Sequence, residues 1–248
     1  MTKRIADISQ RKAAIVAGVA FLIMFIAAII AEFFSRQGLV VPGDAATTAS
    51  NILANEILFR TGIFSYLVIL VLDVVLAWAF YVFLKPVNKD LSLLAAWFRL
   101  VYTAVFGIAL YNLVTVLGLL SGADYLAVFE TDYLHAQVML SLNAFSDGWA
   151  IGYIFFSLHL FVLGYLVFRS GYIPRILGVL LIIASLSYLI DNSAKLVLPN
   201  YADYEAVILL VVFLPALVGE MALCLWLLFK GGKKPEVKNQ DEITAENT

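Results

Sequence analysis

Long apolar runs constrain this chain more than any other feature of its sequence. The first is AAIVAGVAFLIMFIAAIIAEFF, from Ala13 to Phe34, and five further runs follow it. A helix needs about 20 apolar residues to cross the roughly 30 Å hydrocarbon core of a bilayer. Within lipid, a helix satisfies its backbone hydrogen bonds internally, whereas an open sheet leaves the groups at its edges unpaired. The runs therefore predict an all-α integral membrane bundle with six transmembrane helices.

The six predicted spans form a single membrane domain, residues 1–230, which is followed by a tail, residues 231–248. The spans are expected at 13–34, 63–84, 91–120, 140–168, 173–190 and 206–229. Composition agrees, because 63% of the residues are hydrophobic, 14% are charged and the mean hydropathy is +0.95. Soluble proteins carry about 25% charged residues. The tail is polar and is predicted to be disordered. The first run is too long for a signal peptide, so we expect an uncleaved span.

The basic residues predict how the chain is threaded. Twelve of the sixteen lysines and arginines precede the first span, follow the sixth, or lie in the second and fourth connections. Short loops with such an excess of positive charge stay on the cytoplasmic side. We therefore expect both termini in the cytoplasm and the protein in the cytoplasmic membrane. In the fourth connection, Gly171 permits a tight turn between Arg169 and Arg175, and Pro174 is expected to start the next helix.

Two other connections carry local signals on the opposite side. After the turn at Pro42 and Gly43, Asp44 is a predicted N-cap for a surface helix that runs to about Phe59. The segment 121–137 has acidic residues without lysine or arginine, and it is expected to be an outer loop.

Four ionisable residues lie deep within predicted spans: Asp73, Arg99, His159 and Glu220. Each lies roughly 14–18 Å from the cytoplasmic end of its span at about 1.5 Å of rise per residue. A charged group at the centre of a membrane helix costs about 2.5–3.5 kcal/mol, so such groups face the bundle interior and one another. We expect these four side chains to form one polar layer.

The layer is compatible with three roles. Arg99 pairs with one carboxylate, and the second carboxylate must then be protonated, hydrated or paired with His159, which suggests an exchangeable proton. Alternatively, the layer binds a small polar or anionic ligand with Arg99 as its anchor. The third role is purely structural: the layer only fixes the helix register.

A second polar set is predicted toward the outside. Its members are Glu32, Asn112, Asn143, Asp147, Asp191 and Lys195. Water is near at this depth, so the set is either a hydrated rim or the outward mouth of a polar site. We expect Lys195 to neutralise Asp191 four residues away, or Asp147.

Several chemistries lack a sequence signal. His135 and His159 are roughly 36 Å apart along a helix, too far to share a metal ion, and the single cysteine, Cys224, is interpreted as an apolar filler. Phosphate-binding, dinucleotide-binding and nucleophile-elbow glycine motifs are absent from the sequence. We therefore predict no metal, cofactor or nucleic-acid partner.

Three stretches resemble the family called domain of unknown function 4386. They are NEILFRTGIFSYL (55–67), FYVFLKPVNKDLSLLAAWFRLVYTAVFG (80–107) and IFFSLHLFVLGYLVFRSGYIPRILGVLLIIASLSYLID (154–191). The resemblance implies a prokaryotic polytopic membrane protein of similar length, without an assigned activity, cofactor or catalytic residue. It also implies that members of the family share a sequence pattern. In this chain the pattern includes Arg60, Arg99, His159, the segment 85–88 and the loop 169–175.

The resulting expectation is a small transporter or ligand-binding membrane protein built around the polar layer. One alternative is a membrane-embedded enzyme in which His159 acts with Glu220 or Asp73 as acid and base. The other is a structural or regulatory membrane partner without a ligand. The lipid bilayer is the one partner that all three share.

Overall fold

The structure is a computed structural model that describes residues 9–201 and 205–232, with side chains for all of these except 205–216. The described residues are helical and contain no strand. The helices are α1 (Gln10–Ala28), the π-helix η1 (Ile29–Arg36), α2 (Gln37–Leu39), α3 (Ala45–Ala54), α4 (Glu56–Leu84), α5 (Lys89–Leu119), the 3₁₀ turn η2 (Asp124–Leu126), α6 (Thr131–Arg169), α7 (Arg175–Val197) and α8 (Glu205–Phe229).

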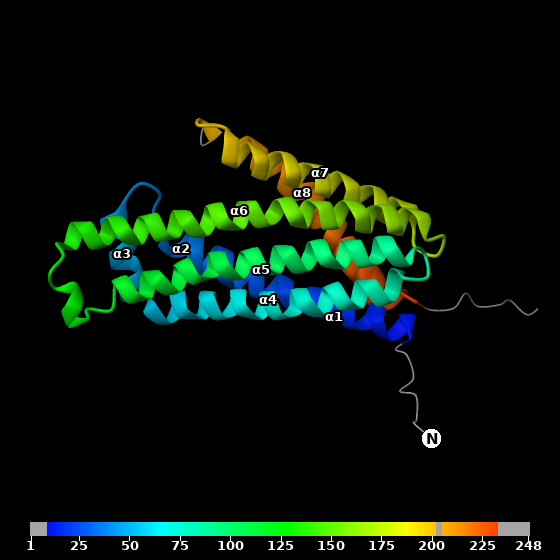
Figure 1. Cartoon of the computed structure of the whole chain (residues 1–248), viewed down its shortest axis with the longest axis horizontal. Helices are drawn as coiled ribbons and strands as arrows, with labels where there is room; N and C mark the ends of the chain where they lie inside the picture. Colours follow the sequence, from blue (N-terminus) through cyan, green and yellow to red (C-terminus); the bar gives the residue numbers. More distant parts are fainter. Residues whose placement is uncertain (1–8, 202–204, 233–248) are drawn as a thin grey trace, which may run out of the picture.

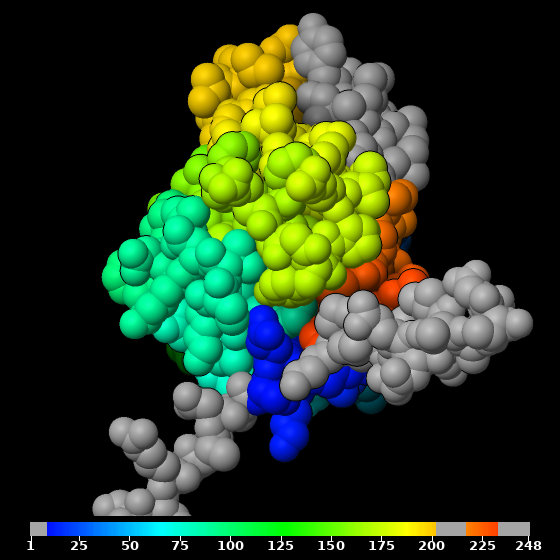
Figure 2. Space-filling view, turned by 90° about the vertical axis from the view of Figure 1, so that its right-hand side faces the viewer, coloured from blue at the N-terminus to red at the C-terminus, as the bar shows by residue number. Residues whose placement is uncertain are grey.

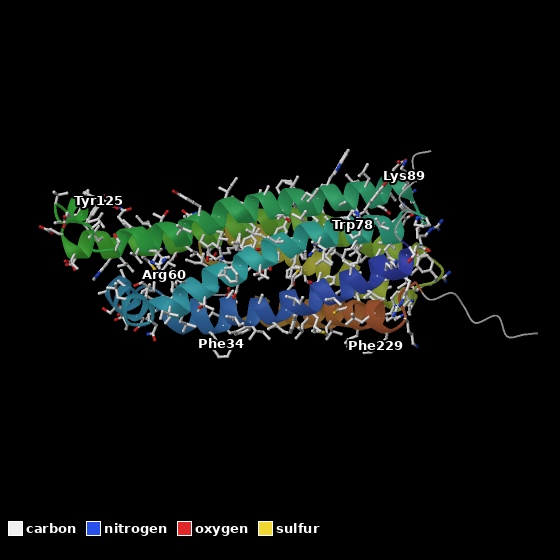
Figure 3. The ribbon with its side chains drawn as sticks, turned by 90° about the horizontal axis from the view of Figure 1, so that it is seen from below. Phe34, Arg60, Trp78, Lys89, Tyr125 and Phe229 are labelled. Atoms are coloured by element: carbon white, nitrogen blue, oxygen red, sulfur yellow. The ribbon has the colours of Figure 1, made fainter. Side chains whose placement is uncertain are left out.

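Five helical segments of the described chain are long and apolar enough to cross a membrane. They are 10–39, 56–84, 89–119, 131–169 and 175–197. The expected sixth span is α8, but the side chains of its first half lie outside the described residues, so that span stays a prediction. Exposed side chains such as Phe34, Trp78 and Phe229 project from the helices away from the bundle (Figure 3). This apolar exterior suits lipid rather than water.

The long helices form a ring in which each packs on its neighbour along the chain. Contacts join α1 to α4, α4 to α5, α5 to α6, α6 to α7 and α7 to α8, and α8 closes the ring against α1 (Figure 1). Short connections favour antiparallel neighbours, because the chain has no length to cross the bundle between them. The centre of this ring is where inward-facing polar groups from all of the long helices meet.

Glycines allow a close crossing between α6 and α7. A β-carbon on Gly164 would lie 2.9 Å from the carbonyl oxygen of Gly178, and one on Gly178 would lie 2.7 Å from the amide nitrogen of Phe168. Small residues let membrane helices approach this closely. From this crossing, α7 diverges from α6 toward its own C-terminal end (Figure 1).

One end of the bundle collects both described ends of the chain, and we call it the hairpin end. The Gln10 amide donates to the Phe83 carbonyl at 3.1 Å, and the Tyr172 hydroxyl donates to the same carbonyl at 3.0 Å. Arg11 donates to the carbonyls of Leu228 and Gly231 at 2.9 and 2.7 Å, which caps the C-terminal end of α8. Figure 2 looks onto this end, where the starts of α1 (blue) and α5 (teal), the α6–α7 hairpin (yellow-green) and the end of α8 (orange-red) share one face.

The basic connections also lie at the hairpin end. Lys89 is at this end and Tyr125 is at the opposite end, which also carries α3 (Figure 3). The predicted tight turn is present, since Gly171 has φ +74°. Pro174 is the N-cap of α7 rather than its first helical residue. The basic connections thus share one end of the bundle, and the side of the membrane that this end faces stays a prediction.

The surface helix after Pro42 is shorter than the sequence predicted. Asp44 caps α3 as expected, because its Oδ1 accepts from the Thr47 amide at 2.9 Å. This hydrogen bond and one from the Thr47 hydroxyl lower the pKa of the Asp44 carboxyl below its ordinary value. The helix ends at Ala54 and not near Phe59, because Asn55 leaves the helical region at φ −128° and ψ 40°, and α4 begins at Glu56.

The predicted start of the fourth span was wrong by about nine residues. Hydropathy placed it at Leu140, whereas α6 begins at Thr131 and has 39 residues, a length of about 58 Å. Its first turns carry Val138, Leu142 and Phe145, which are buried in the bundle. These apolar residues lie on one face of α6, among polar residues on its other faces. An average of hydropathy over a window mixes the two kinds of residue and so does not detect the packing face.

Candidate functional site

Three of the four predicted deep residues meet at the centre of the ring. Asp73 on α4, Arg99 on α5 and His159 on α6 are 0%, 1% and 0% exposed. Arg99 Nη2 donates to Asp73 Oδ1 at 2.5 Å, and Arg99 Nη1 lies 3.1 Å from His159 Nε2. The three side chains can meet because their residues lie at the same depth along their helices. The distance of each residue from the end of its predicted span indicated this common depth.

The hydrogen bonds of His159 define its protonation. Guanidinium groups only donate, so His159 Nε2 must accept from Arg99. The other ring nitrogen, Nδ1, lies 2.8 Å from the carbonyl oxygen of Ala95 and must donate its hydrogen there. Ala95 is one turn before Arg99, so α5 supplies both contacts. His159 is therefore a neutral imidazole whose two nitrogens are both occupied.

Two charged atoms of this cluster lack a partner. Asp73 Oδ2 and Arg99 Nε are buried and have no hydrogen-bond partner among the described residues. Leaving a buried polar group unpaired costs about 1–3 kcal/mol, and more for charged groups. Most such groups in native proteins are satisfied by protein or by an ordered small molecule. These two atoms therefore keep hydrogen-bonding capacity that the three side chains do not use.

Asp73 and Arg99 line a cavity of about 180 Å³ at the centre of the ring, which we call the inner cavity. Glu220 of α8 lines it as well, and it is half-buried. Its Oε1 accepts from the Tyr188 hydroxyl at 3.1 Å. The fourth predicted residue thus shares the cavity with the ion pair, but it forms no hydrogen bond with the other three.

Aromatic side chains make up much of the wall of the inner cavity. Tyr153 stacks on Tyr188 with ring centroids 5.2 Å apart, and Trp149 lies 5.4 Å from Tyr153. The guanidinium of Arg99 lies 5.4 Å from the ring centroid of Phe156. Aromatic faces carry partial negative charge and attract cations, so they stabilise this buried guanidinium.

A larger cavity of about 430 Å³ adjoins the first, and we call it the outer cavity. The two share Glu32, Trp149, Tyr153 and Tyr188 in their walls. The outer cavity is otherwise bounded by η1, by α6 and by the C-terminal part of α7, where α7 has diverged from α6. The shared wall residues place the outer cavity next to the inner one.

Glu32 holds a cluster of its own at the boundary between the cavities. It is in an ion pair and hydrogen bonds with Arg36, it accepts from the Tyr66 hydroxyl at 2.7 Å, and it accepts from the Gln37 amide at 3.1 Å. Glu32 lies in η1, which has the wider turn of a π-helix. In this turn the Gln37 backbone amide donates to the Glu32 carbonyl. Single π turns are frequent at functional sites.

The predicted outer set is divided by the structure. Glu32, Asp191 and Lys195 line the outer cavity. Asn143 and Asp147 are exposed on α6. The Asn112 side chain donates to the Ala109 carbonyl at 3.0 Å. None of these three residues lines either of the two cavities that the described residues enclose. Asp191 accepts from the Tyr201 hydroxyl at 2.7 Å. No ion pair joins Lys195 to Asp191 or Asp147 in the described part of the chain, so that predicted neutralisation is wrong.

Sequence reasoning missed the aromatic residues Trp149, Tyr153 and Tyr188. Their helical spacing offered a signal, since Trp149 and Tyr153 are four residues apart on α6, and Tyr188 is four residues before Asn192 on α7. In a chain with 14% aromatic residues, that spacing alone does not separate a cavity wall from a lipid-facing surface.

The comparisons with known proteins place the chain among proteins without an assigned activity. Residues 16–231 match the family described as domain of unknown function 4386, which confirms the resemblance seen in the sequence. An uncharacterised protein of Archaeoglobus fulgidus is 38% identical over 169 residues, which cover 68% of this chain and 83% of the relative. No solved structure matches the chain.

Proposed function

We propose that this chain, which belongs to the family described as domain of unknown function 4386, is a ligand-binding membrane protein whose site is the inner cavity. The observation that carries the proposal is a buried ion pair with unpaired charged atoms beside that cavity. Intramembrane ionisable residues are functional-site candidates by default. Two adjoining cavities favour a small transporter, because a ligand would reach the inner cavity through the outer one.

Two other functions are less well supported. An enzyme that uses His159 as acid or base needs a ring nitrogen that can exchange a proton with a substrate. Both nitrogens of His159 are engaged within the protein, and His159 does not line the inner cavity. A purely structural layer would be dry and fully paired, whereas Asp73 Oδ2 and Arg99 Nε are unpaired.

We infer that the protein lies in the cytoplasmic membrane with the hairpin end facing the cytoplasm. The support is the basic character of the connections at that end. Lys89→Cys and Tyr125→Cys, each made in a Cys224→Ala chain, test this orientation. In intact cells, a membrane-impermeant thiol reagent is expected to label position 125 and not position 89. The reverse pattern would invert the proposed orientation.

Thiol accessibility also tests whether the inner cavity is a site that water and solutes reach. Met24 lines the inner cavity, whereas Ile26, on the same helix, is exposed on the apolar exterior. In the same Cys224→Ala chain, we expect Met24→Cys to react with a water-soluble methanethiosulfonate at least about tenfold faster than Ile26→Cys, because thiolates form poorly in an apolar environment. Equal, slow reaction at both positions would mean that the cavity is dry, and the ligand-binding function would be rejected.

A further inference from the structure

Of the three carboxylates that line the inner cavity, Glu220 has no basic partner among the described residues. Asp73 is paired with Arg99, and Glu32 is paired with Arg36. Glu220 Oε1 accepts only the hydroxyl of Tyr188 among these residues. A carboxylate in so apolar a place is either protonated or balanced by a positive group. With Glu220 ionised, the inner cavity therefore favours a cation over an anion.

The positive charge of Arg99 is already matched by Asp73. Its Nη1 and Nη2 atoms are committed to His159 and Asp73, and the Phe21 and Phe156 rings lie within 5.7 Å of its guanidinium carbon. Nε has no partner among the described residues. The pair of Arg99 with Asp73 carries no net charge, so it gives an anionic ligand no uncompensated positive charge to bind. This pairing argues against the anionic ligand that the sequence suggested.

The aromatic wall suits a cation for a second, independent reason. Tyr102, Trp149, Tyr153 and Tyr188 line the inner cavity around Glu220. Organic ammonium groups bind among aromatic rings because the ring faces carry partial negative charge, and this attraction is strongest where water is excluded. Anions are repelled by the same faces.

The second carboxylate oxygen of Glu220 narrows the class of ligand. Glu220 Oε2 has no hydrogen bond among the described residues, and a protonated amine supplies N–H groups together with positive charge. A quaternary ammonium carries the charge without a donor. The volume of about 180 Å³ limits the ligand to a small molecule.

We propose that the inner cavity binds a small protonated amine, with Glu220 as its counter-ion and as the acceptor for its N–H through Oε2, and with the aromatic residues as its walls. This inference rests on the proposed ligand-binding function and specifies the ligand's chemical class.

A matched series of probes tests the charge preference on the unmodified chain. The probes are 3-methylbutylammonium, 3-methylbutan-1-ol and 3-methylbutanoate, which share a carbon skeleton and differ in charge. Binding to the purified protein is followed by tryptophan fluorescence, with Trp149→Phe as the control for the reporting residue. We expect the ammonium to bind at least about tenfold more tightly than the alcohol, and the carboxylate to bind most weakly. Tetramethylammonium is expected to bind less tightly than the primary ammonium.

The Glu220→Gln variant tests the counter-ion. It is expected to remove the preference for the ammonium over the alcohol, whereas Glu56→Gln, a surface control in an exposed ion pair with Arg60, leaves it unchanged. Because the probe series needs no variant, it still decides the question if Glu220→Gln does not fold.

The outcomes separate this inference from the function on which it rests. Tightest binding of the carboxylate, or equal binding of ammonium and alcohol, would overturn the amine proposal and leave a ligand site. Absence of binding by every probe, together with fast reaction of Met24→Cys, would overturn the amine proposal alone. If Met24→Cys is also unreactive, the ligand-binding function fails as well.

Discussion

Two arginine–carboxylate pairs line the cavities of this protein, and they are built differently. Arg99 and Asp73 come from two helices, with His159 from a third, and the pair is at most 1% exposed. Arg36 and Glu32 lie one turn apart on η1, and their side chains are 27% and 18% exposed beside the outer cavity. The inner pair depends on the packing of the whole bundle, whereas the outer pair needs only its own helix.

The difference matters for what each pair can do. Removing one partner of a buried ion pair leaves the other charge uncompensated, so the loss of either Asp73 or Arg99 is strongly destabilising. Glu32 has two further partners, Tyr66 and Gln37, and is near a cavity that can hold water. The inner pair is thus suited to a fixed site, and the outer pair is suited to a boundary that adjusts as a ligand passes.

Removing the inner arginine should have the largest effect. We expect Arg99→Met to lower the free energy of unfolding by about 3–5 kcal/mol, because Asp73 then remains buried without a basic partner. The measurement is reversible unfolding in mixed detergent micelles. The double variant Arg99→Met/Asp73→Leu is the control and should recover most of the loss, since neither charge remains. A loss below about 1 kcal/mol for Arg99→Met would contradict the account of a desolvated pair.

Removing the outer arginine should cost less. For Arg36→Met we expect a loss of about 1–2 kcal/mol, because Glu32 keeps the Tyr66 hydroxyl and the Gln37 amide and is partly accessible to water. The same unfolding assay compares the two methionine variants directly. Equal losses for Arg36→Met and Arg99→Met would remove the distinction between the pairs.

The smallest effect is expected from the hydroxyl that links Glu32 to the core. Tyr66→Phe keeps the ring, which lies 5.7 Å from Phe106 between centroids, and deletes only the hydrogen bond to Glu32. The loss should be about 0.5–1 kcal/mol. If Tyr66→Phe and Arg36→Met are combined, the loss should exceed the sum of the single losses, because Glu32 then has only Gln37. Simple additivity of the two losses would mean that the hydroxyl and the guanidinium do not share Glu32.

Sequence patterns predicted the membrane-spanning segments well where the helix is uniformly apolar. The segment 89–119 was expected at 91–120, whereas α6 began nine residues before its predicted start. For the site, depth along each helix correctly indicated that Asp73, Arg99 and His159 can meet. It did not indicate that Glu220 would bond to Tyr188, or that Glu32 would join the wall of the inner cavity, because depth carries no information on the direction in which a side chain points.

The sequence by itself determined that the chain is helical, that at least five segments are apolar enough for a bilayer, and at what depth the charges lie. These properties follow from the transfer of side chains and backbone between water and lipid, which is local along the chain. The tertiary structure alone decided which carboxylate pairs with Arg99, which is left without a base, and where the cavities open. Those outcomes depend on how helices rotate and cross, as at Gly164 and Gly178, and contacts between distant residues set that packing.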